Sequence, residues 1–293
     1  MAPSENQLTL FELPELSGSV PTFKPFRYPV WTESKARLIE RYLYYFVLIT
    51  KHGVYIDGFA GPQEPDKLDT WAAHLVLNSE PRWLRNFFLC DANQSQYQRL
   101  VELKASQPLP KPGEPRSIEV LHADFNETVY QVLLSEAIGE RTATFCLLDQ
   151  RTFECDWQTL EVLAAHKTEG YKIELFYFLP SGWLDRAIAG LGDVSKLEGW
   201  WGRSDWNVLV DANGQERVNL FCDRMRDELG YTYAIGWPIY ERSDGGRIMY
   251  HMIHATDHDI APNLMARAYR QAVFDREEPE QFRLEFEQWE SKT

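Results

Sequence analysis

Short β-rich runs and helical patterns alternate over the first two thirds of the chain. From Thr32, a candidate N-cap, segment 33–51 has apolar residues at helical spacing until His52 and Gly53 end it. Further segments then follow in a regular order. We expect strands at 54–59, 86–91, 118–122, 144–149 and 172–179, and helices at 71–77, 93–105, 126–138, 157–166 and 183–189.

This alternation determines the expected fold class. Parallel strands need crossover connections, which are right-handed, and the helices in them cover both faces of the sheet. In the last third, the β-rich runs 231–241 and 247–256 follow a helix at 214–229 and are joined by a Gly-containing turn typical of a hairpin. We therefore expect an α/β fold, a Rossmann-like, doubly wound and mostly parallel sheet with a C-terminal antiparallel hairpin.

The expected domain organisation is one enlarged α/β domain with additions. Residues 1–30 are rich in Pro, Ser and Glu and predict an extended arm, whereas 276–293 form an acidic tail. Between them, 31–275 is the predicted α/β domain. A Gly- and Trp-rich segment, 191–213, interrupts it as an insertion or lid. Its tryptophans either line a cleft or partner surface or pack the insertion itself.

Composition narrows the function classes. The 293 residues are 44% apolar and 14% aromatic, which predicts a folded protein. The 44 acidic and 30 basic residues give a formal charge of −14. We therefore do not expect a protein that binds nucleic acid without a basic partner or a local basic groove. The four cysteines include no CxxC pair and are expected to be buried thiols. The sequence contains neither a signal-peptide pattern nor a membrane-length apolar run, so we expect a cytoplasmic protein.

Carboxylates follow four successive predicted strands, as Asp57, Asp91, Asp124 and Asp149. Each one alone is explained as a helix N-cap. All four together, behind a first turn that contains glycines, favour a shared ligand site, because ligands of open parallel sheets bind outside the carboxyl ends of the strands.

The first turn, Gly58 to Gln63, indicates the kind of ligand. Glycine lets the backbone approach a ligand closely, and an acid after the second strand can bind ribose hydroxyls. A dinucleotide needs its pyrophosphate at the helix N-terminus, where the acid Asp57 would repel it. S-adenosylmethionine carries a sulfonium and an ammonium and no phosphate, so charge favours it as the cofactor.

Several of these residues together resemble the three-Cys-motif partner (TcmP) family, whose members have a class I methyltransferase-like fold. The resemblance covers about residues 31 to 272. It is carried by Asp57 to Pro62, Leu148 to Arg151, Trp157, the strand Lys172 to Phe178, Ala255 to His258, Leu264, Met265, Ala268 and Tyr269. The three cysteines of the family name belong to a radical-enzyme-like partner protein, so a partner of that kind is implied.

The resemblance implies a role for each strand end. Asp57 with Gly58, Phe59, Ala60 and Gly61 would hold the methionine part of the cofactor, Asp91 the ribose, and Asp124 with Phe125 the adenine. The family turn usually ends in glycine, whereas this chain has Gln63, whose side chain would narrow the cofactor site.

Asp149 and Gln150 are the predicted catalytic residues, facing the methyl acceptor. Methyl transfer requires alignment of the acceptor and a group that accepts its proton. The stretch from Asp149 to Phe153 partly matches the acid or amide, Pro-Pro and aromatic pattern of nucleobase amino-methyltransferases. Phe153 stacks on a planar acceptor or belongs to the core, and Arg151 contacts a phosphate or pairs with Glu154.

We therefore expect methyl transfer from S-adenosylmethionine, with a nucleobase as one candidate acceptor. Two alternatives stay open. One is an inactive, methyltransferase-like scaffold of a three-Cys-motif protein, and the other is a nuclease with Asp57, Asp91 and Asp149 as metal ligands. His251, His254 and His258 are not expected to share a metal, since the first two fall on opposite faces of a strand. Charged residues on the first helix, among them Lys35 and Arg41, predict a solvated face.

Overall fold

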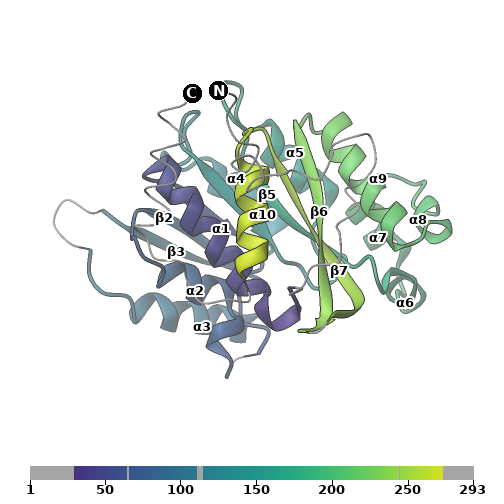
Figure 1. The fold of residues 1–293 in the computed structure, drawn as a ribbon, viewed down its shortest axis with the longest axis horizontal. Coiled ribbons are helices and arrows are strands. Elements are labelled where there is room, and N and C mark those ends of the chain that lie inside the picture. The colour runs from purple at the N-terminus through teal and green to yellow at the C-terminus, as the bar shows by residue number, and fades with distance from the viewer. Residues whose placement is uncertain (1–29, 65, 111–114, 244, 273–293) are drawn as a thin grey trace, which may run out of the picture.

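Seven strands form one sheet in the order β3-β2-β1-β4-β5-β7-β6 (Figure 1). The computed structural model describes residues 30–64, 66–110, 115–243 and 245–272. The strands are β1 (Val54–Asp57), β2 (Asn86–Asp91), β3 (Ser117–His122), β4 (Thr144–Leu148), β5 (Glu174–Leu179), β6 (Tyr233–Arg242) and β7 (Gly245–Thr256). The first five are parallel, and β7 pairs antiparallel with both β5 and β6.

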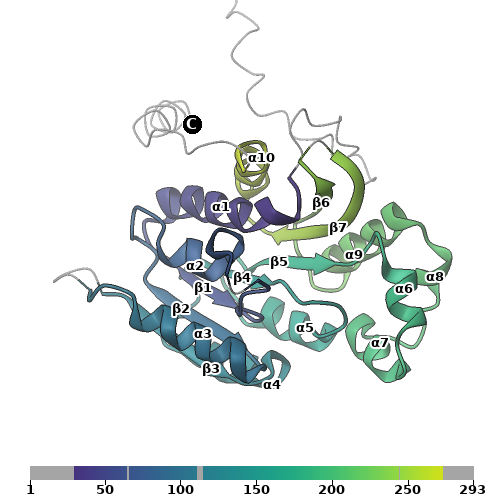
Figure 2. The same ribbon diagram turned by 90° about the horizontal axis from the view of Figure 1, so that it is seen from below.

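Helices cover both faces of this sheet. On one face lie α1 (Lys35–Thr50), α2 (Ala72–Leu77), α3 (Gln94–Ala105) and α10 (Ala261–Gln271). On the other lie α4 (Phe125–Leu133), α5 (Trp157–Ala165), α6 (Leu184–Ala189), α7 (Val194–Trp201), α8 (Val208–Asp211) and α9 (Gly214–Asp227). Two short 3₁₀ turns, η2 (Thr32–Ser34) and η3 (Leu68–Thr70), precede α1 and α2. Figure 2 shows α1 and α10 on one side of the sheet and α4 and α5 on the other.

The central strands are buried on both faces because each alternates between two apolar clusters. In β4, Phe145 and Leu147 face the cluster under α1, whereas Cys146 and Leu148 face the cluster under α5. Burial on both faces explains why β1, β4 and β5 read as largely continuous apolar runs rather than as alternating ones. The edge strand β3, which is partly exposed, alternates instead.

The predicted α/β class, the parallel sheet and the terminal antiparallel pair are confirmed. The helix expected at 126–138 is shorter and ends at Leu133. The expected insertion 191–213 contains α7 and α8, which belong to the core cluster on the α5 face. The predicted arm 1–30, except for Val30, and the acidic tail 276–293 lie outside the described residues.

Candidate functional site

The turn after β1 is held by backbone hydrogen bonds to both neighbouring strands. Gly58 N–H donates to the carbonyl of Leu147 (3.0 Å), and Ala60 N–H donates to that of Cys90 (2.8 Å). The indole Nε1 of Trp71 donates to the Ala60 carbonyl (2.6 Å). These three hydrogen bonds fix the position of the turn over the carboxyl ends of β1, β2 and β4.

Both glycines of this turn are required by close packing. A Cβ on Gly58 would lie 2.6 Å from Cδ1 of Phe125, and one on Gly61 would lie 2.4 Å from Cβ of Gln96. Neither glycine has a positive φ, so space rather than backbone conformation selects them. The turn therefore packs directly against α3 and α4, and these contacts within the protein account for both glycines.

Asp57 ends β1 as a buried carboxylate, 2% exposed. Its Oδ2 accepts a hydrogen bond from the Tyr55 hydroxyl (2.8 Å), and its Oδ1 accepts one from Phe59 N–H (3.2 Å). Burial raises the pKa of Asp57 to about 7, and the charges of Asp149 and Asp91 add to the rise, although the two hydrogen bonds oppose it. Asp149 and Asp91 thus lie close enough to Asp57 for their charges to disfavour its ionised form.

Asp91 ends β2 and is fixed by the backbone on both sides. Its Oδ2 accepts from Gly61 N–H (3.0 Å), and its Oδ1 accepts from Asn93 N–H (2.8 Å). Each carboxylate oxygen accepts more than one hydrogen bond, so capacity for a ligand hydroxyl is left. Asp124, in contrast, is the exposed N-cap of α4, and its Oδ1 accepts from Asn126 N–H (2.8 Å).

Asp149 follows β4 and forms a buried ion pair with Lys35, the first residue of α1. Lys35 Nζ lies 2.5 Å from Asp149 Oδ2, with the side chains 7% and 12% exposed. Burial is the largest influence and acts to lower the pKa of Lys35, but the charges of Asp149 and Tyr250 and the hydrogen bonds to both together outweigh it, so the pKa lies above its ordinary value. The other oxygen, Asp149 Oδ1, is buried without a hydrogen-bond partner.

Two adjoining cavities surround these carboxylates, and we call them together the carboxyl-edge site. The larger has a volume of about 440 Å³ and the smaller about 50 Å³. Asp91, Asp124, Phe125 and Asp149 line the larger, together with Gly58, Phe59, Gly61, Gln63, Arg151, Phe153, Glu154, Asp156 and Lys196. Asp57 and Lys35 line the smaller, and Phe59, Gly61, Gln63 and Asp149 line both. The larger volume is in the range of small-molecule sites.

Gln150 does not reach this site as a catalytic group. It is fully buried, its Oε1 accepts from the backbone N–H groups of Glu154 and Cys155, and its Nε2 donates to the Phe178 carbonyl. Because both ends of the amide bind backbone, Gln150 holds the loop after β4. The predicted catalytic role is therefore corrected to a structural one.

Other expectations for the loop after β4 are partly changed. Phe153 is 8% exposed and packs on Trp200 at 4.9 Å between ring centroids, so it belongs to the core even though it lines the larger cavity. Glu154 Oε2 accepts from the backbone N–H of Arg151 (2.7 Å). The two are thus joined through the backbone, which leaves the exposed Arg151 guanidinium at the edge of the cavity.

The solvated face predicted for the first helix is wrong for two of its cations. Lys35 and Arg41 are each 6% exposed. Lys35 is buried because its partner Asp149, 114 residues away in sequence, lies beneath the start of α1. Charge patterning along one helix contains no sign of such a long-range pair.

The three histidines serve separate structural contacts. His251 is hydrogen-bonded to the Ser181 hydroxyl (2.6 Å), and burial lowers the pKa of His251 to about 4. His254 contacts Glu174, and His258 Nδ1 accepts from Ile260 N–H (3.3 Å). No group of three or more His, Cys, Asp or Glu side chains within the described ranges is arranged to hold a metal ion.

The tryptophans of the segment 191–213 pack rather than line a cleft. Trp200 and Trp201 are 0% and 2% exposed and both contact Phe221 of α9. All four cysteines are buried and free, as expected. Within the part of the chain that the structure describes, every helix is too short or too polar to cross a bilayer.

Sequence reasoning missed three residues that shape the carboxyl-edge site. Lys35 neutralises Asp149, and Trp71 fixes the turn. Asn126, at the start of α4, accepts from Asp156 N–H (2.9 Å) and Thr159 Oγ1 (2.7 Å) and donates to the Glu154 carbonyl (2.7 Å), which joins α4 to the start of α5 and to the loop before it. Asn126 follows Asp124 closely enough to be noticed as a polar residue at a strand end. The roles of Lys35 and Trp71 depend on tertiary contacts.

Comparison with solved structures finds distant likenesses. The solved structure of protein LPL1258 from Legionella pneumophila, described under the family designation DUF519, has a TM-score of 0.43 and 11% sequence identity. The match covers 83% of this chain and 93% of that one. No protein-family model and no curated protein matches the chain. A likeness at this level carries no argument about function, which therefore depends on the geometry of the site.

Proposed function

We propose that the chain is an S-adenosylmethionine-dependent methyltransferase with a class I methyltransferase-like fold. The observation that carries this proposal is the convergence of Asp57, Asp91, Asp124 and Asp149 around the glycine turn at one edge of the sheet. A further support is the sheet itself, in which five parallel strands are followed by the antiparallel strand β7 between β5 and β6. Both features agree with the family that the sequence resembles.

The residues present fit this cofactor. Gly58, Phe59 and Gly61 of the first turn line the larger cavity, and Asp91 retains acceptor capacity for ribose hydroxyls. Acidic residues outnumber the two basic ones, Arg151 and Lys196, in the lining of the larger cavity. An acidic lining favours a sulfonium and an ammonium and disfavours a pyrophosphate. The cofactor, when bound, supplies an activated methyl group.

Asp149 is the residue of this chain that would meet the methyl acceptor. Lys35 holds Asp149 Oδ2, and the unpartnered Oδ1 remains available to accept a hydrogen bond. We infer that Oδ1 accepts a hydrogen bond from an amine or hydroxyl of the acceptor and so orients it. As the acceptor atom bonds to the methyl group and becomes positively charged, its proton passes to Oδ1, which leaves the product and the carboxyl group neutral. The partial nucleobase pattern after Asp149 and the nearby ring of Phe153 make a nucleobase amine the first acceptor to test.

A second candidate function is favoured by the same ion pair. Lys35 already binds Asp149 Oδ2 and compensates its charge, so the pair is complete within the protein without any methyl acceptor. An inactive methyltransferase-like scaffold that supports a three-Cys-motif protein would keep the fold and the pair without catalysis. Such a protein would co-purify with its cysteine-rich partner and transfer no methyl group to a nucleobase.

Isothermal titration calorimetry with S-adenosylmethionine and S-adenosylhomocysteine tests the proposal. We expect the wild type to bind both and Asp91→Ala to bind at least about tenfold more weakly, because hydrogen bonds to a charged group are worth roughly 1.5–3 kcal/mol. Asp227→Ala, which removes an exposed carboxylate from α9, is the matched control and should bind as the wild type does. Absence of binding by the wild type at millimolar ligand would refute the cofactor assignment.

A further inference from the structure

A second cavity lies at the opposite edge of the sheet, where β4 and β5 begin. It has a volume of about 450 Å³, and we call it the amino-edge cavity. Its walls come from the end of α1, the loops 139–143 and 170–173 that lead into β4 and β5, and the start of α10. The amino-edge cavity and the carboxyl-edge site lie at opposite ends of β4. The five residues of this strand span roughly 17 Å, at about 3.3 Å per residue.

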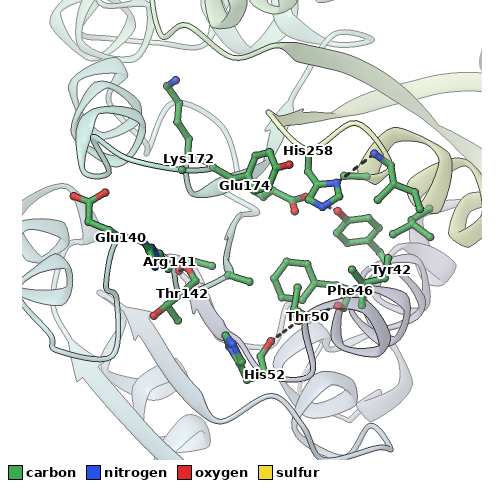
Figure 3. Close-up of a pocket in the computed structure, with 18 residues that line it drawn as sticks. Tyr42, Phe46, Thr50, His52, Glu140, Arg141, Thr142, Lys172, Glu174 and His258 are labelled. Atoms are coloured by element: carbon green, nitrogen blue, oxygen red, sulfur yellow. Dashed lines mark hydrogen bonds between the residues drawn. The ribbon is translucent and has the colours of Figure 1, made fainter. Parts of the chain in front are cut away.

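The floor of the amino-edge cavity carries one buried carboxylate. Glu174, the first residue of β5, is 7% exposed, and its Oε2 accepts hydrogen bonds from the Tyr42 hydroxyl and from His254 Nε2 (2.8 Å). Because a carboxylate only accepts, His254 carries its proton on Nε2. Figure 3 shows Tyr42, Glu174 and His258 together at one end of the cavity and Thr50 and His52 at the other.

The remaining oxygen of Glu174 determines what the amino-edge cavity can hold. Oε1 accepts no hydrogen bond from any described residue, since both donors bind Oε2. The walls around it are largely apolar. They include Phe46, Ile49, Ala143, Ile260, Ala261 and Leu264. A carboxylate oxygen among apolar groups is stabilised by a donor, and a positively charged donor gives the stronger bond.

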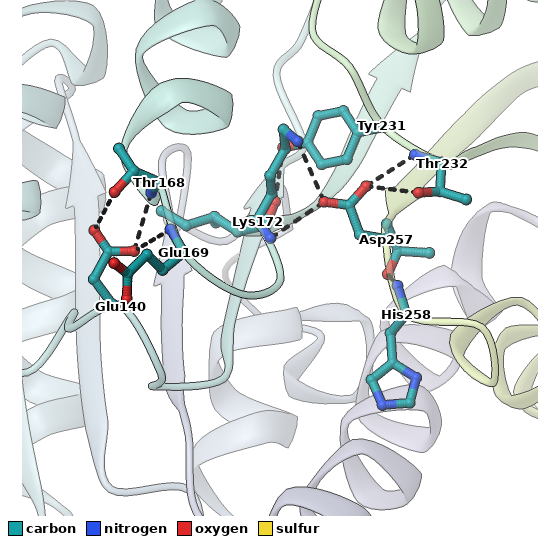
Figure 4. Close-up of polar contacts among 10 residues, drawn as sticks. Glu140, Thr168, Glu169, Lys172, Tyr231, Thr232, Asp257 and His258 are labelled. Carbon is teal, nitrogen blue, oxygen red and sulfur yellow. Dashed lines mark hydrogen bonds and ion pairs between the residues drawn. The ribbon is translucent and has the colours of Figure 1, made fainter.

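The other charged groups of this cavity are mostly satisfied elsewhere. Figure 4 shows Lys172 directed at Asp257 (Nζ to Oδ2, 3.4 Å), which also accepts from Thr232. Glu140 accepts from the backbone N–H groups of Thr168 and Glu169. Arg141 is exposed at the mouth and His52 is half-buried there, so water screens their effect on the floor. His258 uses Nδ1 to accept from the backbone of α10.

We propose that the amino-edge cavity is a binding site for a small organic amine. The ammonium group donates to Oε1 of Glu174, and the apolar body of the amine packs between the end of α1 and the start of α10. The aromatic rings of Tyr42, Phe46 and Tyr171 in the lining attract the same positive charge. This site uses none of the residues of the proposed methyltransferase site.

Three ligands of similar size and different charge test the class of ligand. Calorimetric titrations compare phenethylamine, the neutral phenethyl alcohol and the anionic hydrocinnamate with the full chain. We expect the amine to bind at least about tenfold more tightly than the alcohol, since a hydrogen bond to a charged partner is worth roughly 1.5–3 kcal/mol. Equal binding of the alcohol, tighter binding of hydrocinnamate, or no binding of the amine at millimolar concentration would each overturn the proposal.

Three variants locate the binding of the amine. Ile49→Trp places a large ring from the partly exposed end of α1 into the cavity and should abolish amine binding, whereas Leu48→Trp, one residue away and outside the lining, should retain it. Glu174→Gln keeps the side-chain size and an acceptor for Tyr42, so it should bind amine and alcohol equally. Unchanged amine affinity in Ile49→Trp or an unchanged preference in Glu174→Gln would contradict the assignment. Binding of S-adenosylhomocysteine should be the same in all three variants.

Discussion

The buried carboxylate of Asp57 should make the protein less stable at neutral pH than its own asparagine variant. Asp57 is 2% exposed, and its pKa is raised from 3.8 to about 7 in the folded protein. The ionised form is therefore disfavoured in the folded state. Below a pH of about 4, the unfolded pKa, ionisation of Asp57 does not affect the free energy of unfolding. Between pH 4 and the folded pKa of about 7 the destabilisation grows, and above that pH it stays constant. Asp57→Asn removes the charge and hence this dependence.

The size of the effect follows from the two pKa values. One pKa unit corresponds to about 1.36 kcal/mol, so ionisation of Asp57 costs roughly 1–2 kcal/mol at pH 5 and about 4 kcal/mol at pH 8. Asparagine has one acceptor oxygen where aspartate has two, so one hydrogen bond is weakened in Asp57→Asn. This lowers the free energy of unfolding by about 1 kcal/mol, almost independently of pH. Relative to the wild type, the free energy of unfolding of Asp57→Asn should increase by about 2–3 kcal/mol between pH 5 and pH 8.

Urea unfolding followed by tryptophan fluorescence at both pH values measures this difference directly. The matched control is Asp124→Asn, which removes a carboxylate from the same edge of the sheet at an exposed position. Water solvates that carboxylate in the folded and unfolded states alike, so its variant should show no comparable growth. A difference between Asp57→Asn and the wild type that stays constant from pH 5 to pH 8 would refute the reasoning.

Three further outcomes follow from the same contacts. The affinity for S-adenosylmethionine should rise about sixteenfold from pH 5.5 to pH 7, because the ionised fraction of Asp57 rises from about 3% to about 50%. Calorimetry on Asp57→Asn should show no such rise. Lys35→Met leaves Asp149 buried without its cation and should lower the free energy of unfolding, measured by urea titration, by about 3 kcal/mol. The double variant Lys35→Met with Asp149→Asn has no unpaired buried charge and should largely recover this loss. Ellman's reagent should label none of the four buried cysteines in the native protein and all of them in denaturant, because burial also raises the pKa of each thiol.

The sequence predicted most of the fold because its signals are local. The strands β1, β2 and β4 are apolar runs that end at an acid or directly before one. Asn93 begins the third predicted helix and is the N-cap of α3, and the helix predicted from Asn126 begins one residue earlier, at Phe125. The strand-end carboxylates were also predictable, because the ends of parallel strands meet at one edge. The cavity between these carboxylates could not be predicted, because its walls come from loops after four different strands.

What could not be predicted depends on long-range partners. The ion pair between Lys35 and Asp149 joins residues 114 positions apart, and the burial of Lys35 contradicts its apparent place on a polar helix face. Gln150 is polar and follows a catalytic candidate, yet its amide binds backbone groups of its own loop. The amino-edge cavity has walls from four separate segments, so no single motif indicated it.

Helix α1 extends from one site to the other. Lys35 at its first turn contacts Asp149, and Ile49 near its last turn lines the amino-edge cavity, about 21 Å away along the helix axis at 1.5 Å per residue. A helix of this length moves as a rod, so a tilt that widens one cavity displaces the cation at the other. Any occupant that favours such a tilt would alter affinity at the distant edge, and linkage requires the influence to be equal in both directions.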